Sequence, residues 1–182
     1  SMAAAVSAVE KAEGAVGVLV NNAGYSQSGP IEEIPIERIR RQYETNVFGL
    51  VRMCQLVLPG MRRQGFGRIV NIGSMGGVLT FPGGGIYHST KYAVEAISDA
   101  LRFEVKGFGV DVVLVQPGLI RTEFSEAAVS SIGAVKKPEG PYGAFTDTVA
   151  KATKEAYEKG PLALLGGSGE DVVRGGAGDD VV

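Results

Sequence analysis

The chain has 182 residues, of which 45% are hydrophobic and 21% charged, as in an ordinary globular domain. Its formal net charge of −2 offers no basic surface to nucleic acid or an anionic membrane, and a single cysteine excludes an intrachain disulfide. No apolar run approaches the roughly 18 residues that a membrane span needs. We therefore expect a cytoplasmic protein with no membrane span and no nucleic-acid partner.

The first part of the chain predicts a helix, a strand, a long helix and a second strand. Residues 2–13 have the apolar spacing of a helix, and the apolar run at 17–21 is typical of a buried strand. A helical pattern extends from residue 35 to 58, Pro59 is expected to kink it, and residues 68–72 form the second apolar run. Cys54 lies inside the long helix, so we interpret it as a buried structural thiol.

The second part continues this alternation. A glycine-rich loop at 73–85 precedes a predicted helix at 87–106, a third buried strand at 110–115 and helical pieces up to residue 160. Buried strands that alternate with helices predict an α/β fold, a doubly wound parallel sheet with helices on both faces. In such a sheet the carboxyl ends of the strands lie at one edge, where ligands bind.

Polar residues follow each of the three predicted strands. The segment NNAG at 21–24 follows the first strand, Ser74 the second, and the segment PGLIRT at 117–122 the third. Asparagine and glycine are also ordinary turn residues, so each cluster taken alone has a structural explanation. Three clusters at one sheet edge favour a binding site.

Tyr87 and Lys91 lie four residues apart at the start of a predicted helix and therefore share one face. A tyrosine with an ordinary pKa of about 10 is a poor proton shuttle at neutral pH, whereas a nearby cation favours the phenolate. Ser74 can hydrogen-bond the same reacting oxygen. Without the other motifs, a core tyrosine and a solvated lysine would be the simpler interpretation. His88 points about a quarter-turn away, and we interpret it as a surface or loop-facing residue.

Five motifs together resemble the short-chain dehydrogenase/reductase family: NNAG, TNVFG with Asn46, NIGS ending at Ser74, YHSTK at 87–91, and PGLIRT. Their order and spacing match the family across residues 1–165. The resemblance implies an NAD(P)-dependent oxidoreductase that interconverts a carbonyl and an alcohol by hydride transfer. Tyr87 would then be the general acid/base, Lys91 would lower its pKa and hydrogen-bond the nicotinamide ribose, and Ser74 would polarise the substrate oxygen. The backbone carbonyl of Asn46 would hold a water linked to Lys91.

The resemblance also implies a cofactor, NAD or NADP, and no metal. Cofactor contacts would come from Asn22, Ala23, Gly24, Tyr87, Lys91, Pro117, Gly118, Ile120 and Thr122. The family's T-G-x-x-x-G-x-G loop, which holds the pyrophosphate, does not occur in this sequence. We therefore expect a partial Rossmann-like domain at 1–165 with the equivalents of strands 4, 5 and 6 of the family. The strand at 17–21 would lie at an exposed edge.

The segment 125–161 corresponds to the family's variable substrate lid. Apolar residues in and beside it suggest an apolar carbonyl or alcohol as the substrate: Phe124, Val129, Ile132, Tyr142 and Phe145. The resemblance is also consistent with a homo-oligomer, because the equivalent long helices form dimer contacts in the family.

The last residues, 166–182, repeat the pattern GGSGEDVVR and GGAGDDVV at a period of nine. The pattern matches the calcium-binding nonapeptide of parallel β-helices, in which Asp171 or Asp180 and turn carbonyls would bind the ion. At least three repeats are usually needed, so we predict a flexible glycine-rich tail instead. Two alternative functions stay open: a calcium-binding repeat segment, and a catalytically dead scaffold that keeps the fold.

Overall fold

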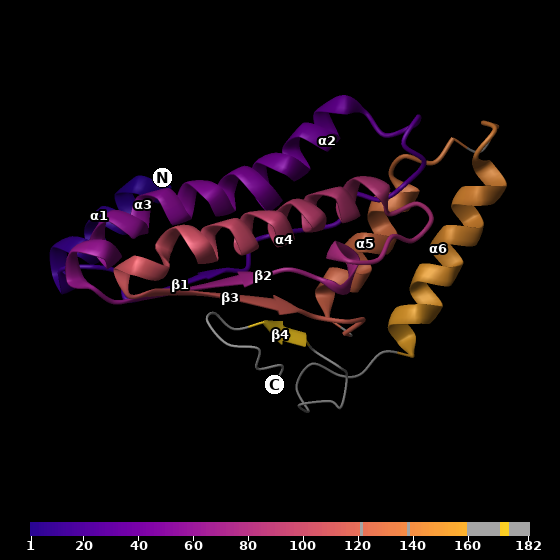
Figure 1. Ribbon diagram of the computed structural model, residues 1–182. Coiled ribbons are helices and arrows are strands. Elements are labelled where there is room, and N and C mark those ends of the chain that lie inside the picture. Colours follow the sequence, from indigo (N-terminus) through magenta and orange to yellow (C-terminus); the bar gives the residue numbers. More distant parts are fainter. Residues whose placement is uncertain (121, 138, 160–171, 175–182) are drawn as a thin grey trace.

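The structure, a computed structural model, describes residues 1–120, 122–137, 139–159 and 172–174. Three parallel strands lie side by side in chain order: β1 (Val18–Asn21), β2 (Gly67–Ile72) and β3 (Val110–Gln116) (Figure 1). The predicted α/β class and all three predicted strands are therefore confirmed. Within the described structure β1 lies at one edge of the sheet, as the sequence predicts.

A fourth strand pairs with β3 from the tail of the chain. Residues Val172–Arg174 (β4) run antiparallel to β3, with Val173 opposite Val115. The glycine-rich composition of the tail predicts no strand, because two valines are too short a run to indicate one. Asp171 and Asp180, on which the calcium hypothesis rests, lie outside the described residues.

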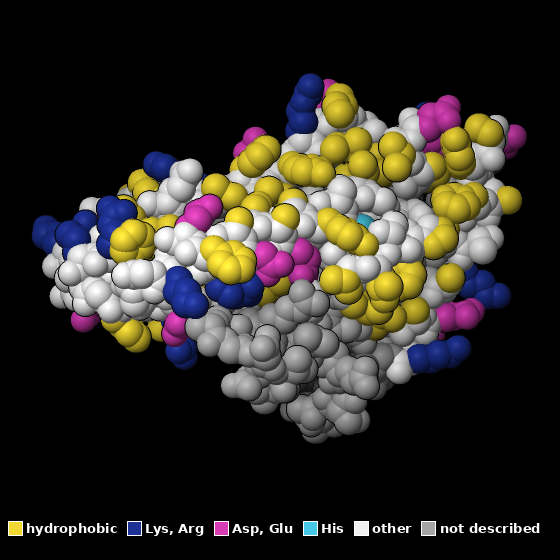
Figure 2. Space-filling model, viewed as in Figure 1, with side chains coloured by type: hydrophobic (Ala, Val, Ile, Leu, Met, Phe, Trp, Pro, Cys, Tyr) yellow, Lys and Arg dark blue, Asp and Glu magenta, His cyan; other side chains and the backbone are white. Residues whose placement is uncertain are grey.

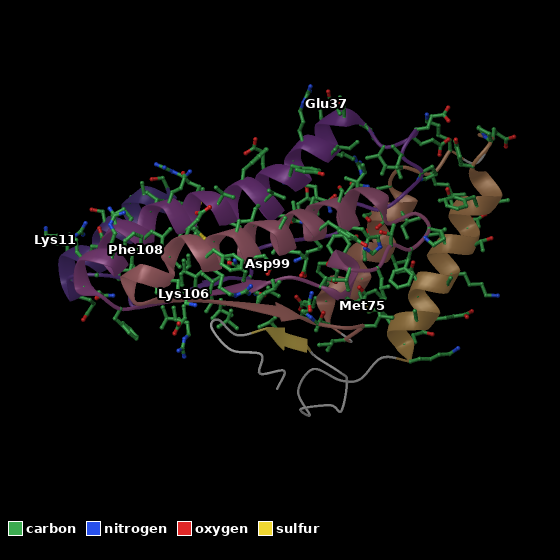
Figure 3. The ribbon with its side chains drawn as sticks, viewed as in Figure 1. Lys11, Glu37, Met75, Asp99, Lys106 and Phe108 are labelled. Atoms are coloured by element: carbon green, nitrogen blue, oxygen red, sulfur yellow. The ribbon has the colours of Figure 1, made fainter. Side chains whose placement is uncertain are left out.

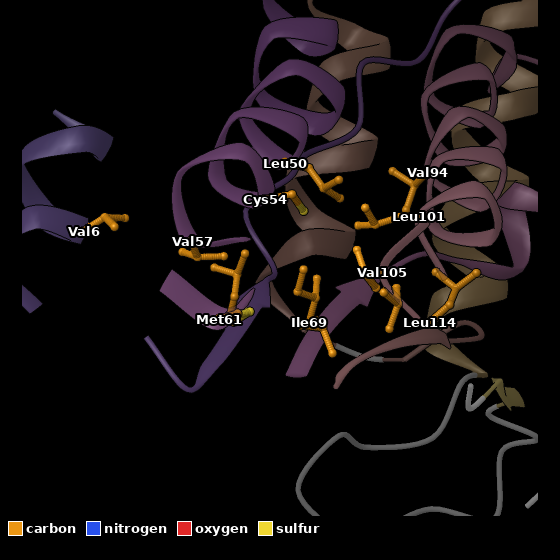
Figure 4. Close-up of a cluster of buried hydrophobic side chains, with 13 residues drawn as sticks. Val6, Leu50, Cys54, Val57, Met61, Ile69, Val94, Leu101, Val105 and Leu114 are labelled. Carbon is orange, nitrogen blue, oxygen red and sulfur yellow. The ribbon is translucent and has the colours of Figure 1, made fainter. Parts of the chain in front are cut away.

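Helices cover one face of the sheet. In Figures 1 and 4, α1 (Met2–Glu13), α3 (Gly49–Gln64) and α4 (Gly85–Val105) lie on the same side of the strands. Leu19, Ile69 and Val112 align across the three strands and are buried against these helices. On the opposite face, Val18 and Val20 are each 56% exposed. Because alternate strand residues point to opposite faces, the expectation of helices on both faces is wrong for the described residues.

The long helix contains a π-turn. α2 (Ile36–Tyr43) continues through the wider turn η1 (Glu44–Phe48) into α3, and the Gly49 N–H donates to the Glu44 carbonyl. The helix contains Pro59 and ends at Gly65, whose φ of 68° lies in the left-handed region that glycine tolerates. The sequence predicts the helix but not the π-turn, which places Asn46 in an irregular turn. Such turns are frequent at functional sites.

Apart from η3, which lies at the amino end of β3, the remaining elements gather at the carboxyl ends of the strands. The short helix η2 (Met75–Gly77) follows β2, η3 (Lys106–Phe108) precedes β3, and α5 (Glu123–Gly133) and α6 (Gly143–Glu158) follow β3. Figure 1 shows α5 and α6 standing beyond the strand ends. None of the helices in the described residues has the length and apolar composition of a membrane span.

Candidate functional site

Ser74 and Tyr87 come together at the carboxyl edge of the sheet. Ser74 follows β2 and begins η2, where its hydroxyl accepts the Gly76 N–H at 3.0 Å and lies close enough to the Tyr87 phenol to lower the pKa of that phenol. The Tyr87 ring, in the first turn of α4, contacts the rings of His88 and Phe124 at centroid distances of 5.6 and 5.7 Å. Figure 3 labels Met75, the residue after Ser74, close to α5 and α6.

The phenol of Tyr87 is protonated at neutral pH. Burial raises the pKa of Tyr87 to about 12; the nearby Ser74 hydroxyl acts to lower this pKa and Tyr157 acts to raise it. The prediction that Lys91 moves this pKa toward neutrality does not hold here, because desolvation dominates. Instead, the Lys91 ammonium lies 5.9 Å from the Tyr87 ring centroid and donates to a backbone carbonyl. A protonated phenol can give a proton to an oxygen that gains negative charge.

Lys91 is a buried cation. Its ammonium donates to the Ile72 carbonyl at 2.8 Å, at the end of β2. Burial lowers the pKa of Lys91 to about 8, and the Glu95 carboxylate, one helical turn further on, acts in the opposite direction. The charge is therefore held at the sheet edge although the protein surroundings disfavour it, which is common at functional sites.

Asn46 joins the loop after β1 to α4. Its side-chain oxygen accepts the Tyr25 N–H at 3.1 Å, and its amide donates to the Tyr25 carbonyl and the Thr90 hydroxyl, both at 3.0 Å. Thr90 in turn donates to the Tyr87 carbonyl at 2.7 Å. The resemblance assigns a role to the backbone carbonyl of Asn46, and that role stays a prediction. The structure gives the side chain of Asn46 a definite role, which is to hold the loop after β1 against α4.

The residues expected to contact the cofactor lie around Lys91. Asn22, Ala23 and Gly24 are exposed at the end of β1, and a Cβ on Gly24 would lie 3.2 Å from the Asn46 side-chain oxygen. Pro117, Gly118 and Ile120 are half-buried after β3, and Thr122 is exposed at the start of α5. Exposed backbone at the end of β1 beside a buried cation fits a nicotinamide nucleotide, which offers hydroxyl and phosphate oxygens.

A cavity of about 500 Å³ adjoins Ser74 and Tyr87. Its described lining comes from the loops after all three strands and from α4, α5 and α6, and contains no Asp, Glu, Lys or Arg. Figure 2 shows hydrophobic side chains gathered on this side of the molecule around the single histidine. A pocket with few polar groups suits an apolar ligand that carries little charge.

The lid residues predicted from composition are only partly found at this cavity. Phe145 lines it, and Phe124 packs against Tyr87. Ile132 is buried in the protein instead, and the Tyr142 hydroxyl donates to the Glu32 carboxylate at the surface. Helical periodicity turns neighbouring apolar residues to different sides, so composition alone does not identify lining residues.

Of the two positions predicted for His88, the surface position is wrong, whereas the ring does face the glycine-rich loop. The ring is buried, lines the cavity, and places its Nδ1 at 2.9 Å from the Gly76 carbonyl oxygen. A Cβ on Gly76 or Gly84 would overlap the ring, so these glycines make room for it. Burial lowers the pKa of His88, and a neutral ring donates its Nδ1–H to that carbonyl. The glycine pairs near the single histidine are the feature of the sequence that could have indicated a buried ring.

Further residues of the site lack a sequence motif. Ser26 and Ser28, in the loop after β1, and Tyr157, near the end of α6, all line the cavity. Cys54 lies away from it: the thiol is buried and burial raises its pKa to about 11, which confirms the structural interpretation. Among the described residues, no group of three His, Cys, Asp or Glu side chains is placed to hold a metal ion.

Comparison with known proteins places these features in a family. Residues 1–132 match the family described as short chain dehydrogenase. The NADPH-dependent 3-dehydrocapnine reductase of Ornithobacterium rhinotracheale is 42% identical over 170 residues, covering 90% of this chain and 59% of that protein. The 3-ketodihydrosphingosine reductase of Bacteroides thetaiotaomicron is 44% identical over 126 residues, covering 69% of this chain and 47% of that protein.

Solved structures agree with these matches. A short chain dehydrogenase/reductase from Burkholderia phymatum, in complex with NAD, superposes with a TM-score of 0.73 at 25% identity, covering 87% of this chain and 57% of that one. The chain spans about half the length of the curated relatives it matches.

Proposed function

From the premise that the chain belongs to the short-chain dehydrogenase/reductase family, we propose that Tyr87 is the general acid/base of a carbonyl–alcohol interconversion. The observation that carries this proposal is that Ser74 and Tyr87 lie together in the wall of a cavity whose described lining has no charged side chain. A buried phenol whose pKa lies near 12 holds its proton until an acceptor of higher basicity forms beside it. The oxygen of a carbonyl under reduction becomes such an acceptor.

The roles of the other residues follow from their positions. The cofactor, when bound, supplies or accepts the hydride. Tyr87 donates its hydroxyl proton to the substrate oxygen in reduction and accepts it in oxidation. Ser74 hydrogen-bonds the same oxygen and stabilises the negative charge that develops there. Lys91 holds a positive charge at the end of β2, near the Tyr87 ring. Asn46 fixes the loop after β1, in which Gly24 lies close to the Lys91 ammonium.

We assign cofactor binding to NAD or NADP at the sheet edge. The residues that would hold it are Lys91, Asn22, Ala23, Gly24, Pro117, Gly118, Ile120 and Thr122. A relative named as NADPH-dependent and a similar structure in complex with NAD support a nicotinamide cofactor. The exposed backbone at Gly24, where a built Cβ would lie 4.0 Å from the Lys91 ammonium, supports this location.

The substrate in this proposal is an uncharged carbonyl or alcohol with a largely apolar body. The uncharged described lining of the cavity supports this, because a charged ligand would lose its hydration there without a partner. Two relatives are named as reductases of 3-dehydrocapnine and of 3-ketodihydrosphingosine, and the second name specifies a keto compound.

Replacement of Tyr87 by phenylalanine tests the proposal. Oxidation of NADH or NADPH is followed by absorbance with a panel of apolar ketones, for the wild type and for Tyr87→Phe. We expect the variant to lose between about 100-fold and 10,000-fold in kcat, the usual contribution of a general acid. Tyr92→Phe is the matched control, because Tyr92 lies on the same helix and is 44% exposed. A Tyr87→Phe variant that kept the wild-type rate would overturn the proposal.

A further inference from the structure

A second polar group faces the cavity from the loop after β1. Ser26 and Ser28 both line the cavity, and their side-chain oxygens are 2.8 Å apart. Their exposed fractions are 4% and 8%, so each is more than nine-tenths buried. Neither serine is one of the catalytic or cofactor-binding residues assigned above.

The hydrogen-bonding capacity of this pair is not used up. Each serine hydroxyl has one proton to donate and two lone pairs to accept. The contact between them consumes one proton and one lone pair, and one hydroxyl proton remains. Within the described part of the chain, neither hydroxyl has another recorded partner. A buried hydroxyl that is not fully satisfied is unfavourable unless a ligand or water completes its hydrogen bonds.

The pair is also held rigidly before any ligand arrives. The Ser28 N–H donates to the Ser131 hydroxyl of α5 at 3.0 Å, and the Gln27 amide donates to the Ser28 carbonyl at 3.1 Å. The next residue, Gly29, donates its N–H to the Gly83 carbonyl at 2.7 Å. A polar group fixed in this way binds a ligand without first losing conformational entropy.

The chemistry of the partner follows from the charges of the lining. A carboxylate or phosphate would find no Lys or Arg among the described lining residues, and an ammonium group no Asp or Glu. A neutral hydroxyl both donates and accepts, and so complements the free proton and lone pairs of the pair. We infer that Ser26 and Ser28 form a subsite for a hydroxyl group of the substrate, so that the preferred substrate is a hydroxyketone.

This inference rests on the proposed function, since it places the carbonyl of the same molecule at Ser74 and Tyr87. It makes the serine pair a specificity determinant, while Tyr87 carries the proton transfer. The serine subsite and the role of Tyr87 can therefore fail separately. Binding measured without turnover tests the subsite, whereas the rate of reduction tests Tyr87.

The test uses 2-octanone and a series of hydroxy-2-octanones whose hydroxyl is placed on successive carbons. Binding to the protein without cofactor is measured by ligand-observed NMR titration for wild type, Ser26→Ala and Ser28→Ala. One member of the series should bind the wild type about two- to tenfold more tightly than the plain ketone, as one buried hydrogen bond allows. Each serine variant should remove that preference while it leaves binding of the plain ketone unchanged.

Thr148→Val is the matched control. Thr148 also lines the cavity, but its hydroxyl donates to the Ala144 carbonyl of its own helix at 2.9 Å, so the preference should survive this change. A wild type that favours no member of the series, or a preference that persists in both serine variants, overturns the subsite. Under either result, reduction that still depends on Tyr87 leaves the proposed function intact. A serine-dependent preference with Tyr87-independent reduction would overturn only the proposed function.

Discussion

The buried charge of Lys91 makes the stability of the protein depend on pH in a specific direction. Burial lowers the pKa of Lys91 from 10.5 to about 8. Between these two values the unfolded chain binds more protons at this position than the folded chain does. The free energy of unfolding therefore rises as the pH increases through this window. A lysine in a strong ion pair would have a raised pKa and would act in the opposite sense, so the direction distinguishes a desolvated Lys91 from an ion-paired one.

The magnitude follows from the difference between the two pKa values. One pH unit corresponds to about 1.36 kcal/mol, so a fall from 10.5 to about 8 corresponds to about 3 kcal/mol. Between pH 7 and pH 10 the contribution of Lys91 to the free energy of unfolding should rise by about 2 kcal/mol. Lys91→Met has a side chain of similar length without the charge and should lack this component.

Urea unfolding of the wild type and Lys91→Met, measured in parallel from pH 7 to pH 10, provides the assay. Other groups titrate in both proteins and cancel in the difference between the two free energies of unfolding. That difference should change by about 2 kcal/mol in favour of the wild type as the pH rises. A difference that stays constant with pH, or that moves the other way, would refute the conclusion that the Lys91 charge is desolvated in the folded state.

Three other predictions test the architecture around the site. Asn46→Ala should lower the free energy of unfolding by about 2–3 kcal/mol in urea, because the backbone N–H and carbonyl of Tyr25 each lose a hydrogen bond. Thr45→Ala should change it by less than about 0.5 kcal/mol, because Thr45 is only half-buried and its hydroxyl bonds a carbonyl one turn earlier. Gly83→Ala should lower the melting temperature more than Gly14→Ala. Both glycines have positive φ, but only a Cβ on Gly83 would collide with a neighbour, the Val149 side chain at 2.6 Å. Equal melting temperatures of the two variants would contradict this. NMR titration of His88 should give a pKa below 6.5 in the folded protein and near 6.5 in urea. The free energy of unfolding should therefore fall as the pH drops below about 6.5. A pKa above 6.5 in the folded protein would exclude burial of the neutral ring.

The sequence predicts the order of strands and helices because apolar periodicity and glycine breaks are strong in this chain. It also predicts that Ser74 and Tyr87 meet, since the parallel topology brings the strand ends to one edge. Spacing cannot tell whether the Lys91 ammonium turns toward Tyr87 or toward the Ile72 carbonyl, because that choice depends on which buried oxygens lie within reach.

Other features of the site depend on contacts between distant segments. The burial of His88 requires Gly76 and Gly84 to lie against its ring, and the glycines in the sequence do not by themselves show that contact. The role of the Asn46 side chain depends on Tyr25, 21 residues earlier, and on a π-turn that helix propensity does not indicate. The one-sided cover of the sheet likewise depends on where the helices pack, whereas strand residues on both faces are apolar in the sequence.

The most direct test of the account follows the hydride and the proton source together. NADH or NADPH carrying two deuterium atoms at the C4 position of the nicotinamide is incubated with the protein and an apolar ketone, and the product alcohol is examined by mass spectrometry. The account predicts one deuterium on the carbinol carbon with wild type and Tyr92→Phe, and product reduced at least about 100-fold with Tyr87→Phe. Deuterated alcohol formed by Tyr87→Phe at the wild-type rate would contradict the account.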